Sequence, residues 1–205
     1  MTRRLLALAA VATLAAAPAA LADGDPASDY LISQHVFVPF DAKISPARAT
    51  QLQAIVDDAT RRGFTVRVAL IATRFDLGAV PSLWRRPQPY ARFLGQELFF
   101  AYKDRLLVVM PNGYGVSRRG KPLPAAQRLA DSLPEPGAGG ERLAAAAVVA
   151  VQRLAAQAGV AVSVPPLRAP AAAPSNDRDR LVILLVVLAV SGAAAVFYAL
   201  RRLRA

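Results

Sequence analysis

The stretch SPARATQLQAIVDDATRRGFTVRVALIA, Ser45 to Ala72, decides the fold of this chain. Ser45 followed by Pro46 is typical of a helix start, because the serine hydroxyl can accept from a free backbone amide and proline suits the first turn. Gly63 is typical of a helix end. Between them, apolar residues recur at helical spacing: Leu52, Ile55, Val56 and Ala59. Phe64–Ala72 is then almost continuously apolar, so an amphipathic helix is predicted to lead directly into a buried strand.

A second buried strand and a hairpin follow further along the chain. Arg105–Met110, RLLVVM, has the composition of an inner strand, and Asn112-Gly113 favours a tight turn into a short strand over Tyr114–Arg118. A loop is expected at Thr73–Pro89, and three further helices at Tyr90–Ala101, Ala125–Leu133 and Glu141–Gln157. This order favours a small α/β domain in which a parallel crossover joins the first two strands.

The first 22 residues have the pattern of a secretory signal peptide. Arg3 and Arg4 make a positive start, Leu5–Ala17 is apolar, and Ala20-Leu21-Ala22 is a small-x-small cleavage pattern. An uncleaved anchor is the alternative reading, but the apolar run is short for a span and Pro18 interrupts its end. Cleavage after Ala22 is therefore predicted.

The other end has the pattern of a membrane span. Leu181–Leu200 carries no charge and has the length of about 20 residues that a transmembrane helix needs. Tyr198 lies where an interfacial aromatic is favoured, and the tail 201–205 is rich in arginine. By the positive-inside rule the tail is cytoplasmic, so the chain is expected to be a single-pass protein of the cell membrane whose N-terminal domain is extracytoplasmic.

Three segments lie between the signal peptide and the span. Residues 23–35 are polar, with Gly24 and Pro26, and are expected to be flexible. Residues 36–164 form the domain. Residues 165–180, PPLRAPAAAPSNDRDR, have the composition of an extended tether.

Charge and composition exclude several classes of function. Asp23–Asn176 carries 18 basic and 12 acidic residues, a net charge of +6. A positive charge of this size favours binding to anionic lipid or cell-wall polymer, but it can also serve only to keep the domain soluble. Nucleic acid is not expected outside the membrane. The chain has no cysteine, so disulfides and thiolate metal sites are excluded, and His35 alone cannot supply a zinc site built on several histidines.

Several motifs together resemble the TPM-domain family of membrane-anchored extracytoplasmic α/β domains. The resemblance covers Val36–Val164 and rests on FDAKIS at Phe40–Ser45, TVRVALI at Thr65–Ile71, Tyr90-Ala91, DRLLVV at Asp104–Val109 and Gly113-Tyr114-Gly115. It implies a small mixed sheet with helices on both faces. Some members of that family are reported to bind divalent metal and hydrolyse phosphate esters, whereas others maintain the envelope or its membrane complexes. One departure is that Ser117–Lys121 is basic where the family has an acidic stretch.

Polar residues follow each predicted strand or precede the helix beside it. In an open α/β sheet ligands bind at the carboxyl ends of the strands, and a parallel crossover brings Asp41, Asp76 and Asn112 to that edge. Their hard oxygen atoms suit Ca²⁺ or Mg²⁺, and Arg74 lies where it could contact a phosphate. Asp104 begins the second strand and is expected at the opposite edge.

Structural roles explain the same residues without a metal. Asp41 can stabilise a helix start, Asp76 a loop turn, and Asn112 a positive φ in the hairpin. The loop WRRP, with Trp84, Arg85 and Arg86, can bind an anionic headgroup or glycan, or else fold over the domain and partly bury Trp84.

Three functions remain open on these observations. The first is a non-catalytic TPM-like module for interaction with envelope proteins or for maintenance of the envelope. The second is a divalent-metal-dependent phosphatase of the same fold. The third is a polyanion or lipid-surface binder that uses the arginine loops.

Overall fold

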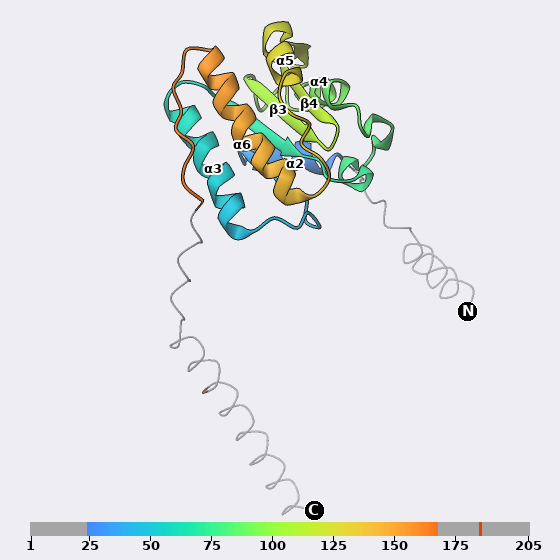
Figure 1. Cartoon of the computed structure of the whole chain (residues 1–205). Coiled ribbons are helices and arrows are strands. Elements are labelled where there is room, and N and C mark those ends of the chain that lie inside the picture. The colour runs from blue at the N-terminus through green and yellow to red at the C-terminus, as the bar shows by residue number, and fades with distance from the viewer. Residues whose placement is uncertain (1–23, 168–184, 186–205) are drawn as a thin grey trace, which may run out of the picture. The chain divides into compact units, whose positions relative to one another are not determined.

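The computed structural model describes residues 24–167 and residue 185, and within them lies one five-stranded sheet in the order β1-β2-β3-β4-β5 (Figure 1). The strands are β1 (Val36–Phe37), β2 (Val66–Leu70), β3 (Arg105–Met110), β4 (Gly113–Arg118) and β5 (Lys121–Pro122). The first three strands run parallel, and β4 and β5 are antiparallel to their neighbours. The prediction of an α/β domain with a mixed sheet is confirmed.

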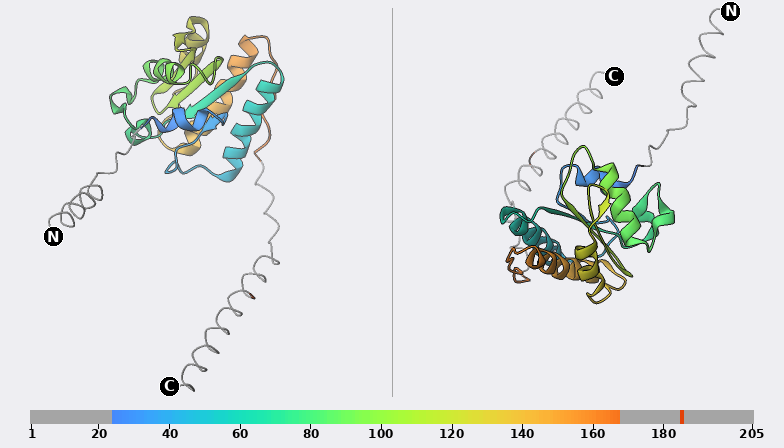
Figure 2. Two further views of the ribbon diagram at one scale, coloured as in Figure 1. Left: turned by 180° about the vertical axis from the view of Figure 1, so that it is seen from behind. Right: turned by 90° about the horizontal axis from the view of Figure 1, so that it is seen from above.

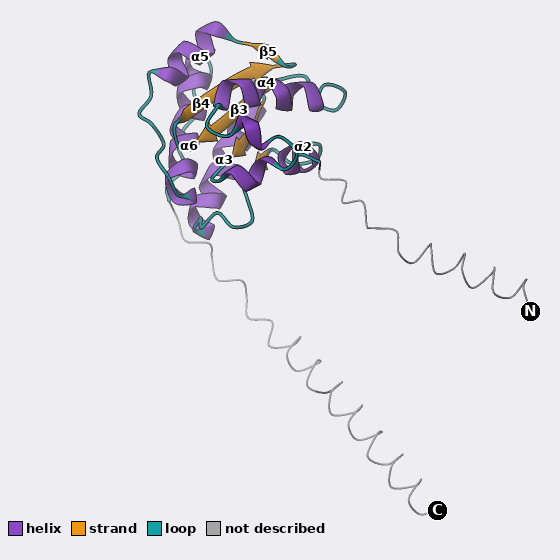
Figure 3. Ribbon diagram, turned by 90° about the vertical axis from the view of Figure 1, so that its right-hand side faces the viewer, coloured by secondary structure: helices purple, strands orange, loops and turns teal. Residues whose placement is uncertain are grey.

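Helices pack against both faces of this sheet (Figure 2). The helical elements are α2 (Pro26–Leu31), α3 (Pro46–Arg61), the 3-10 turns η1 (Arg74–Leu77) and η2 (Pro81–Leu83), α4 (Pro87–Glu97), α5 (Pro124–Asp131) and α6 (Gly140–Gln157). Figure 3 shows α2 and α4 on one side of the strands, with α3 and α6 across the sheet from them. The sheet is thus the middle layer of three.

Each face of the sheet has its own hydrophobic core, because successive side chains of a strand point to opposite faces. Val66, Val68 and Leu70 of β2 face α3 and α6, and form the larger core with β3 and β4. Ala69 and Ile71 face α2 and α4, in a smaller core. The nearly continuous hydrophobicity of the predicted strand is explained by this double burial.

Helix α3 begins as the sequence predicts. The Ser45 hydroxyl accepts from the Arg48 amide at 3.3 Å, and Pro46 follows it. Past the other end, Gly63 has a φ of 90°, a left-handed conformation that favours glycine. The chain can therefore turn at once from α3 into β2.

The predicted parallel crossover from β2 to β3 is also confirmed. Val66 pairs with Arg105 and Leu70 with Val109, and α4, which lies between the two strands in the sequence, packs on one face of the sheet over β3 and β4. The ends of β1, β2 and β3 consequently lie at one edge of the sheet, which we call the carboxyl edge. Asp104, just before β3, lies at the opposite edge, which we call the amino edge.

Within residues 23–35, which were predicted to be flexible, Pro26–Leu31 form helix α2. Asp25 caps α2 by accepting from the Ala27 amide at 3.1 Å, and Leu31 is fully buried. Arg67 of β2 donates to the Leu31 carbonyl and so fastens the end of the helix. The polar composition misleads here because α2 needs only a few apolar side chains to close the smaller core.

The predicted signal peptide, most of the predicted tether and the predicted transmembrane helix at 181–200 lie outside the described residues, apart from Leu185. Among the residues that are described, no helix combines the length and the apolar character needed to cross a bilayer. The domain itself ends within residues 158–167, where Val162 is buried in the larger core.

Glycine allows α4 and β4 to approach each other closely. A Cβ atom at Gly115 of β4 would overlap the carbonyl group of Pro87 at the start of α4. At Gly95 of α4 it would lie 2.5 Å from the backbone nitrogen of Gly120. Both clashes are with backbone, which a side-chain rotation cannot relieve.

We therefore expect Gly115→Ala to lower the free energy of unfolding by about 1 to 3 kcal/mol, the usual cost of overpacking. Chemical denaturation of the two proteins measures the difference. Gly24→Ala is the control, because the new methyl group would meet only the side chain of Asp29, at 3.2 Å. An equal loss in both variants would show that the α4–β4 approach is not tight.

Candidate functional site

The carboxyl edge carries all three residues predicted to bind a metal. Asp41 lies exposed in the loop after β1, Asp76 lies in η1 after β2, and Asn112 lies in the turn after β3. A surface hollow of about 330 Å³ is lined by Asp41, by Thr73 and by the loop that starts α6. Asp76 and Asn112 do not line this hollow.

Asp76 uses both of its carboxylate oxygens to hold its own turn. Oδ2 accepts from the backbone amides of Ala72 and Thr73, each at 2.7 Å, and Oδ1 accepts from the Thr73 hydroxyl at 3.1 Å. This arrangement is a capping box at the start of η1. A metal ion would compete with three hydrogen bonds at this carboxylate.

Asn112 joins two loops of the carboxyl edge. Its Nδ2 donates to the Arg85 carbonyl at 2.8 Å, while its Oδ1 is buried and without a hydrogen-bond partner among the described residues. Arg85 has a φ of 59°, and the bond from Asn112 helps to hold that unusual conformation. The positive φ of the hairpin falls at Gly113 and not at Asn112.

A further polar cluster ties the start of α6 to the start of α3. Glu141 accepts from the Ser45 amide at 2.9 Å and from Arg48 Nε at 3.1 Å. The hydrogen bond from the Ser45 backbone lowers the pKa of Glu141 below its usual range, with the Arg48 bond acting in the same direction. Over the described part of the chain, no three acidic or histidine side chains are grouped so as to hold a metal. The metal site at Asp41, Asp76 and Asn112 stays a prediction.

The loop with Trp84 folds over the domain. Trp84 is partly buried against the smaller core, whereas Arg85 and Arg86 are exposed. Arg74, on the neighbouring turn, is also exposed, and its guanidinium lies 5.8 Å from the centre of the Phe75 ring. The cations predicted to contact phosphate or an anionic partner therefore point to solvent around the carboxyl edge.

Two exposed phenylalanines at this edge were not expected from the sequence. Phe40, in the loop after β1, is fully exposed, and Phe75, in η1, is 82% exposed. Their loops are neighbours, because Ala42 and Thr73 line the same hollow. The signal that could have found them is an aromatic residue that breaks a polar loop pattern directly after a strand.

Both ends of the described domain lie toward the carboxyl edge. The backbone of Gly24 packs against Gly78, just past η1. Pro165 accepts from Gln51 Nε2 at 2.5 Å, in the half of α3 nearer to its start. Figure 1 shows these two ends and the loop after β1 on the lower side of the domain.

A buried carboxyl–phenol pair lies beneath this edge, between α2 and α4. The Tyr90 hydroxyl donates to Asp25, with its oxygen 2.8 and 3.0 Å from the two carboxylate oxygens. Burial raises the pKa of Asp25 to about 6, although the hydrogen bonds from Tyr90 and Ala27 oppose the rise. Burial and the nearby Asp25 also raise the pKa of Tyr90, so its hydroxyl remains a donor. This pair joins α2 to the domain.

Comparison with known proteins places this chain in no established group. No family model, no curated protein and no solved structure matches it. The chemistry of the carboxyl edge is therefore the basis on which a function can be assigned.

The hydrogen bonds of Asp76 and Asp41 predict different effects of substitution. We expect Asp76→Ala to lower the free energy of unfolding by about 1 to 2 kcal/mol without any metal, because three hydrogen bonds are lost. Asp41→Ala should cost less than about 0.5 kcal/mol, because Asp41 is an exposed side chain with no hydrogen bond among the described residues. Denaturation in the presence of a chelator tests both. A loss from Asp76→Ala no larger than the loss from Asp41→Ala would show that the capping box is not stabilising.

The buried Asp25 predicts a dependence of stability on pH. Its pKa is raised from 3.8 to about 6 on folding, so the folded state binds the proton more tightly and stability from this group falls as pH rises from about 4 to about 6. Asp25→Asn can keep the hydrogen bonds and removes the titration. The stability of the variant relative to wild type should rise by about 2 to 3 kcal/mol between pH 4 and pH 7. Asp29→Asn, at an exposed position of α2, should show no such trend.

Proposed function

We propose that this chain is a membrane-anchored, extracytoplasmic module of the TPM-like type that acts by contact at the cell envelope and not by catalysis. The contact surface is the carboxyl edge, and its immediate partner is the anionic surface of the membrane that holds the chain. The observation that carries the proposal is the pairing of two exposed phenylalanines with exposed cations on the edge toward which both ends of the domain run.

The chemistry of this edge suits the interface of a bilayer. Phe40 and Phe75 leave apolar rings in water, an arrangement that gains free energy when the rings enter the headgroup region. Lys43 and Arg74 are exposed on the same loops. Each such cation near an anionic leaflet contributes about 1 kcal/mol of attraction.

The course of the chain supports the same orientation. The tether predicted for residues 165–180 starts from Pro165, which is bonded to the first half of α3. With a span at 181–200, a tether of this length would let the carboxyl edge reach the bilayer. The amino edge, with Phe100 on its turn before β3, would face away.

A metal-dependent phosphatase is the second candidate, and one observation favours it. The parallel crossover brings Asp41, Arg74, Asp76 and Asn112 to a single edge, as ligand sites in α/β sheets require. In that mechanism the carboxylates would hold Ca²⁺ or Mg²⁺ and Arg74 would bind phosphate. The three hydrogen bonds at Asp76 weigh against it. Metal-dependent hydrolysis of a phosphate ester that Asp41→Asn abolishes would favour this candidate over the first.

Site-specific quenching tests the contact with the membrane, and the absence of cysteine makes labelling simple. Phe40→Cys and Phe75→Cys are labelled with a fluorophore, and the full chain is reconstituted in vesicles containing phosphatidylglycerol and spin-labelled lipid. Both probes should be quenched by the lipid. The control is Phe100→Cys, because Phe100 is 93% exposed but lies at the amino edge, and it should not be quenched.

The charge of the edge gives a second measurement in the same vesicles. Replacement of Lys43 and Arg74 by glutamine, or 1 M salt, should reduce the quenching at Phe75→Cys, since salt at that concentration screens charges beyond about 3 Å. Equal quenching at all three positions, or none at positions 40 and 75, would refute the proposed orientation.

A further inference from the structure

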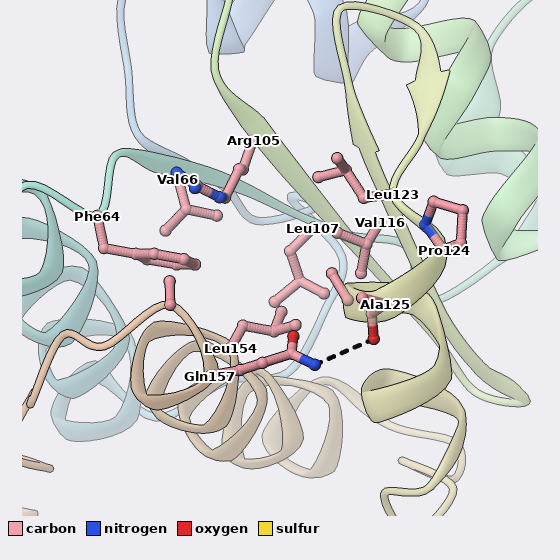
Figure 4. Close-up of a pocket in the computed structure, with 12 residues that line it drawn as sticks. Phe64, Val66, Arg105, Leu107, Val116, Leu123, Pro124, Ala125, Leu154 and Gln157 are labelled. Atoms are coloured by element: carbon pink, nitrogen blue, oxygen red, sulfur yellow. Dashed lines mark hydrogen bonds between the residues drawn. The ribbon is translucent and has the colours of Figure 1, made fainter.

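An apolar pocket opens at the amino edge, away from the surface proposed to meet the membrane. It has a volume of about 310 Å³ and lies between the larger-core face of the sheet, the start of α5 and the end of α6 (Figure 4). Leu107 and Val116 form the sheet side, and Leu154 of α6 forms the opposite side. Nothing in the proposed function uses this pocket.

The start of α5 and the end of α6 are joined by a hydrogen bond at the mouth of the pocket. Gln157, in the last turn of α6, donates from Nε2 to the Ala125 carbonyl of α5 at 3.1 Å, as the dashed line in Figure 4 shows. Ala125 and Ala158 are small and exposed at the mouth, so they leave the space between the helix ends unfilled. A hydrogen bond between the helix ends thus bridges an opening that larger side chains would have closed.

The pocket is open to solvent and is large enough to hold a small ligand. A cavity of about 150 Å³ lined by apolar side chains can already bind benzene. The space here is sufficient for a short acyl chain and lies at the lower end of the range of ligand pockets.

One charged side chain lines this pocket, and it is a cation. Arg105 begins β3, and its guanidinium lies 4.6 Å from the centre of the Phe64 ring at the rim. Among the described residues Arg105 makes no salt bridge, whereas its cross-strand neighbour Arg118 is paired with Asp104. The lining contains no carboxylate. An apolar cavity with a single guanidinium at its rim is complementary to an apolar chain that ends in an anion.

We propose that this pocket binds a small apolar carboxylate, a fatty acid of medium chain length, with its chain between Leu107, Val116 and Leu154 and its carboxylate on Arg105. The planar guanidinium matches a carboxylate with two parallel hydrogen bonds, which an alcohol or an amine cannot reproduce. Burial of the acyl chain contributes the affinity, and Arg105 determines the specificity for a carboxylate headgroup.

The test uses the full chain in lipid nanodiscs, with octanoate as the probe and 1-octanol and octylamine as matched controls of equal chain length. Binding is followed by methyl NMR of Leu107, Val116 and Leu154, which separates the pocket from partition into lipid. Octanoate should shift these methyl signals to saturation, with an affinity about threefold to tenfold higher than that of octanol.

Matched variants test the two parts of the proposal separately. Arg105→Gln should reduce octanoate binding to the level of octanol, while Arg128→Gln, at an exposed position of α5 outside the pocket, should not. Ala125→Phe should fill the mouth and abolish the shifts, and Ala156→Phe, exposed on α6 outside this pocket, should leave them. If Ala125→Phe does not fold, the comparison of octanoate with octanol in the wild type and in Arg105→Gln decides alone.

Two results would overturn the proposal. One is the absence of saturable shifts at the three residues up to the solubility limit of octanoate. The other is equal binding of octanol or octylamine, which would leave Arg105 without a role in recognition. Neither result would bear on the membrane contact at the carboxyl edge, because that contact is measured at positions 40 and 75.

Discussion

The parallel pairing of β2 with β3 controls the arrangement of the remaining elements. Two parallel neighbours need a long connection, and η1, η2 and α4 provide it across one face of the sheet. That connection covers the smaller core, leaves the other face to α3 and α6, and brings the loops after β1, β2 and β3 to one edge. The two ends of the sheet consequently differ in chemistry, with aromatics and cations at the carboxyl edge and an apolar pocket at the amino edge.

The two cores are stabilised in different ways. The larger core relies on aliphatic side chains from four strands, β1 to β4, and on the many alanines of α6, which let that helix lie close to α3. The smaller core contains a carboxyl group, Asp25, whose burial is tolerated because Tyr90 and the Ala27 amide both donate to it. A short helix of six residues is thus held by a polar contact as well as by Leu31. The carboxyl edge is built above this less apolar side of the domain.

The sequence predicted those helices and strands in which a regular spacing of apolar residues coincides with residues typical of a helix or strand end. The second strand was expected at the same bounds as β3, and Ser45-Pro46 marked the start of α3. Helix α2 was missed, although Asp25-Pro26 is itself a capping signal, because a helix of one or two turns has too few residues to show a period. Its burial depends on Tyr90, which is distant in the sequence.

From the sequence, the candidate site could be predicted only as a set of residues that share one edge of the sheet. Parallel strands alone place Asp41, Asp76 and Asn112 together. The hydrogen bonds that occupy Asp76 depend on the exact course of the turn after β2, and the contact of Asn112 depends on the conformation of Arg85. The pocket at Arg105 arises from the distance between two helix ends that are far apart in the chain. No local pattern encodes the last two features, whereas Thr73 and Asp76 do have the spacing of a capping box.

The position of α6 at the end of the domain affects the order in which the molecule can assemble. If the chain is exported N-terminus first, as the predicted signal peptide would require, α2, β1 and α3 emerge before the other strands of the sheet. The larger core is closed only by α6 and by Val162, so it stays open until nearly the whole domain has crossed. Residues 163–180 alone then separate the last core residue from the predicted span. Folding would therefore finish at the membrane surface, while the span is entering the bilayer, and the unfinished apolar face would be protected from aggregation only for as long as export remains rapid.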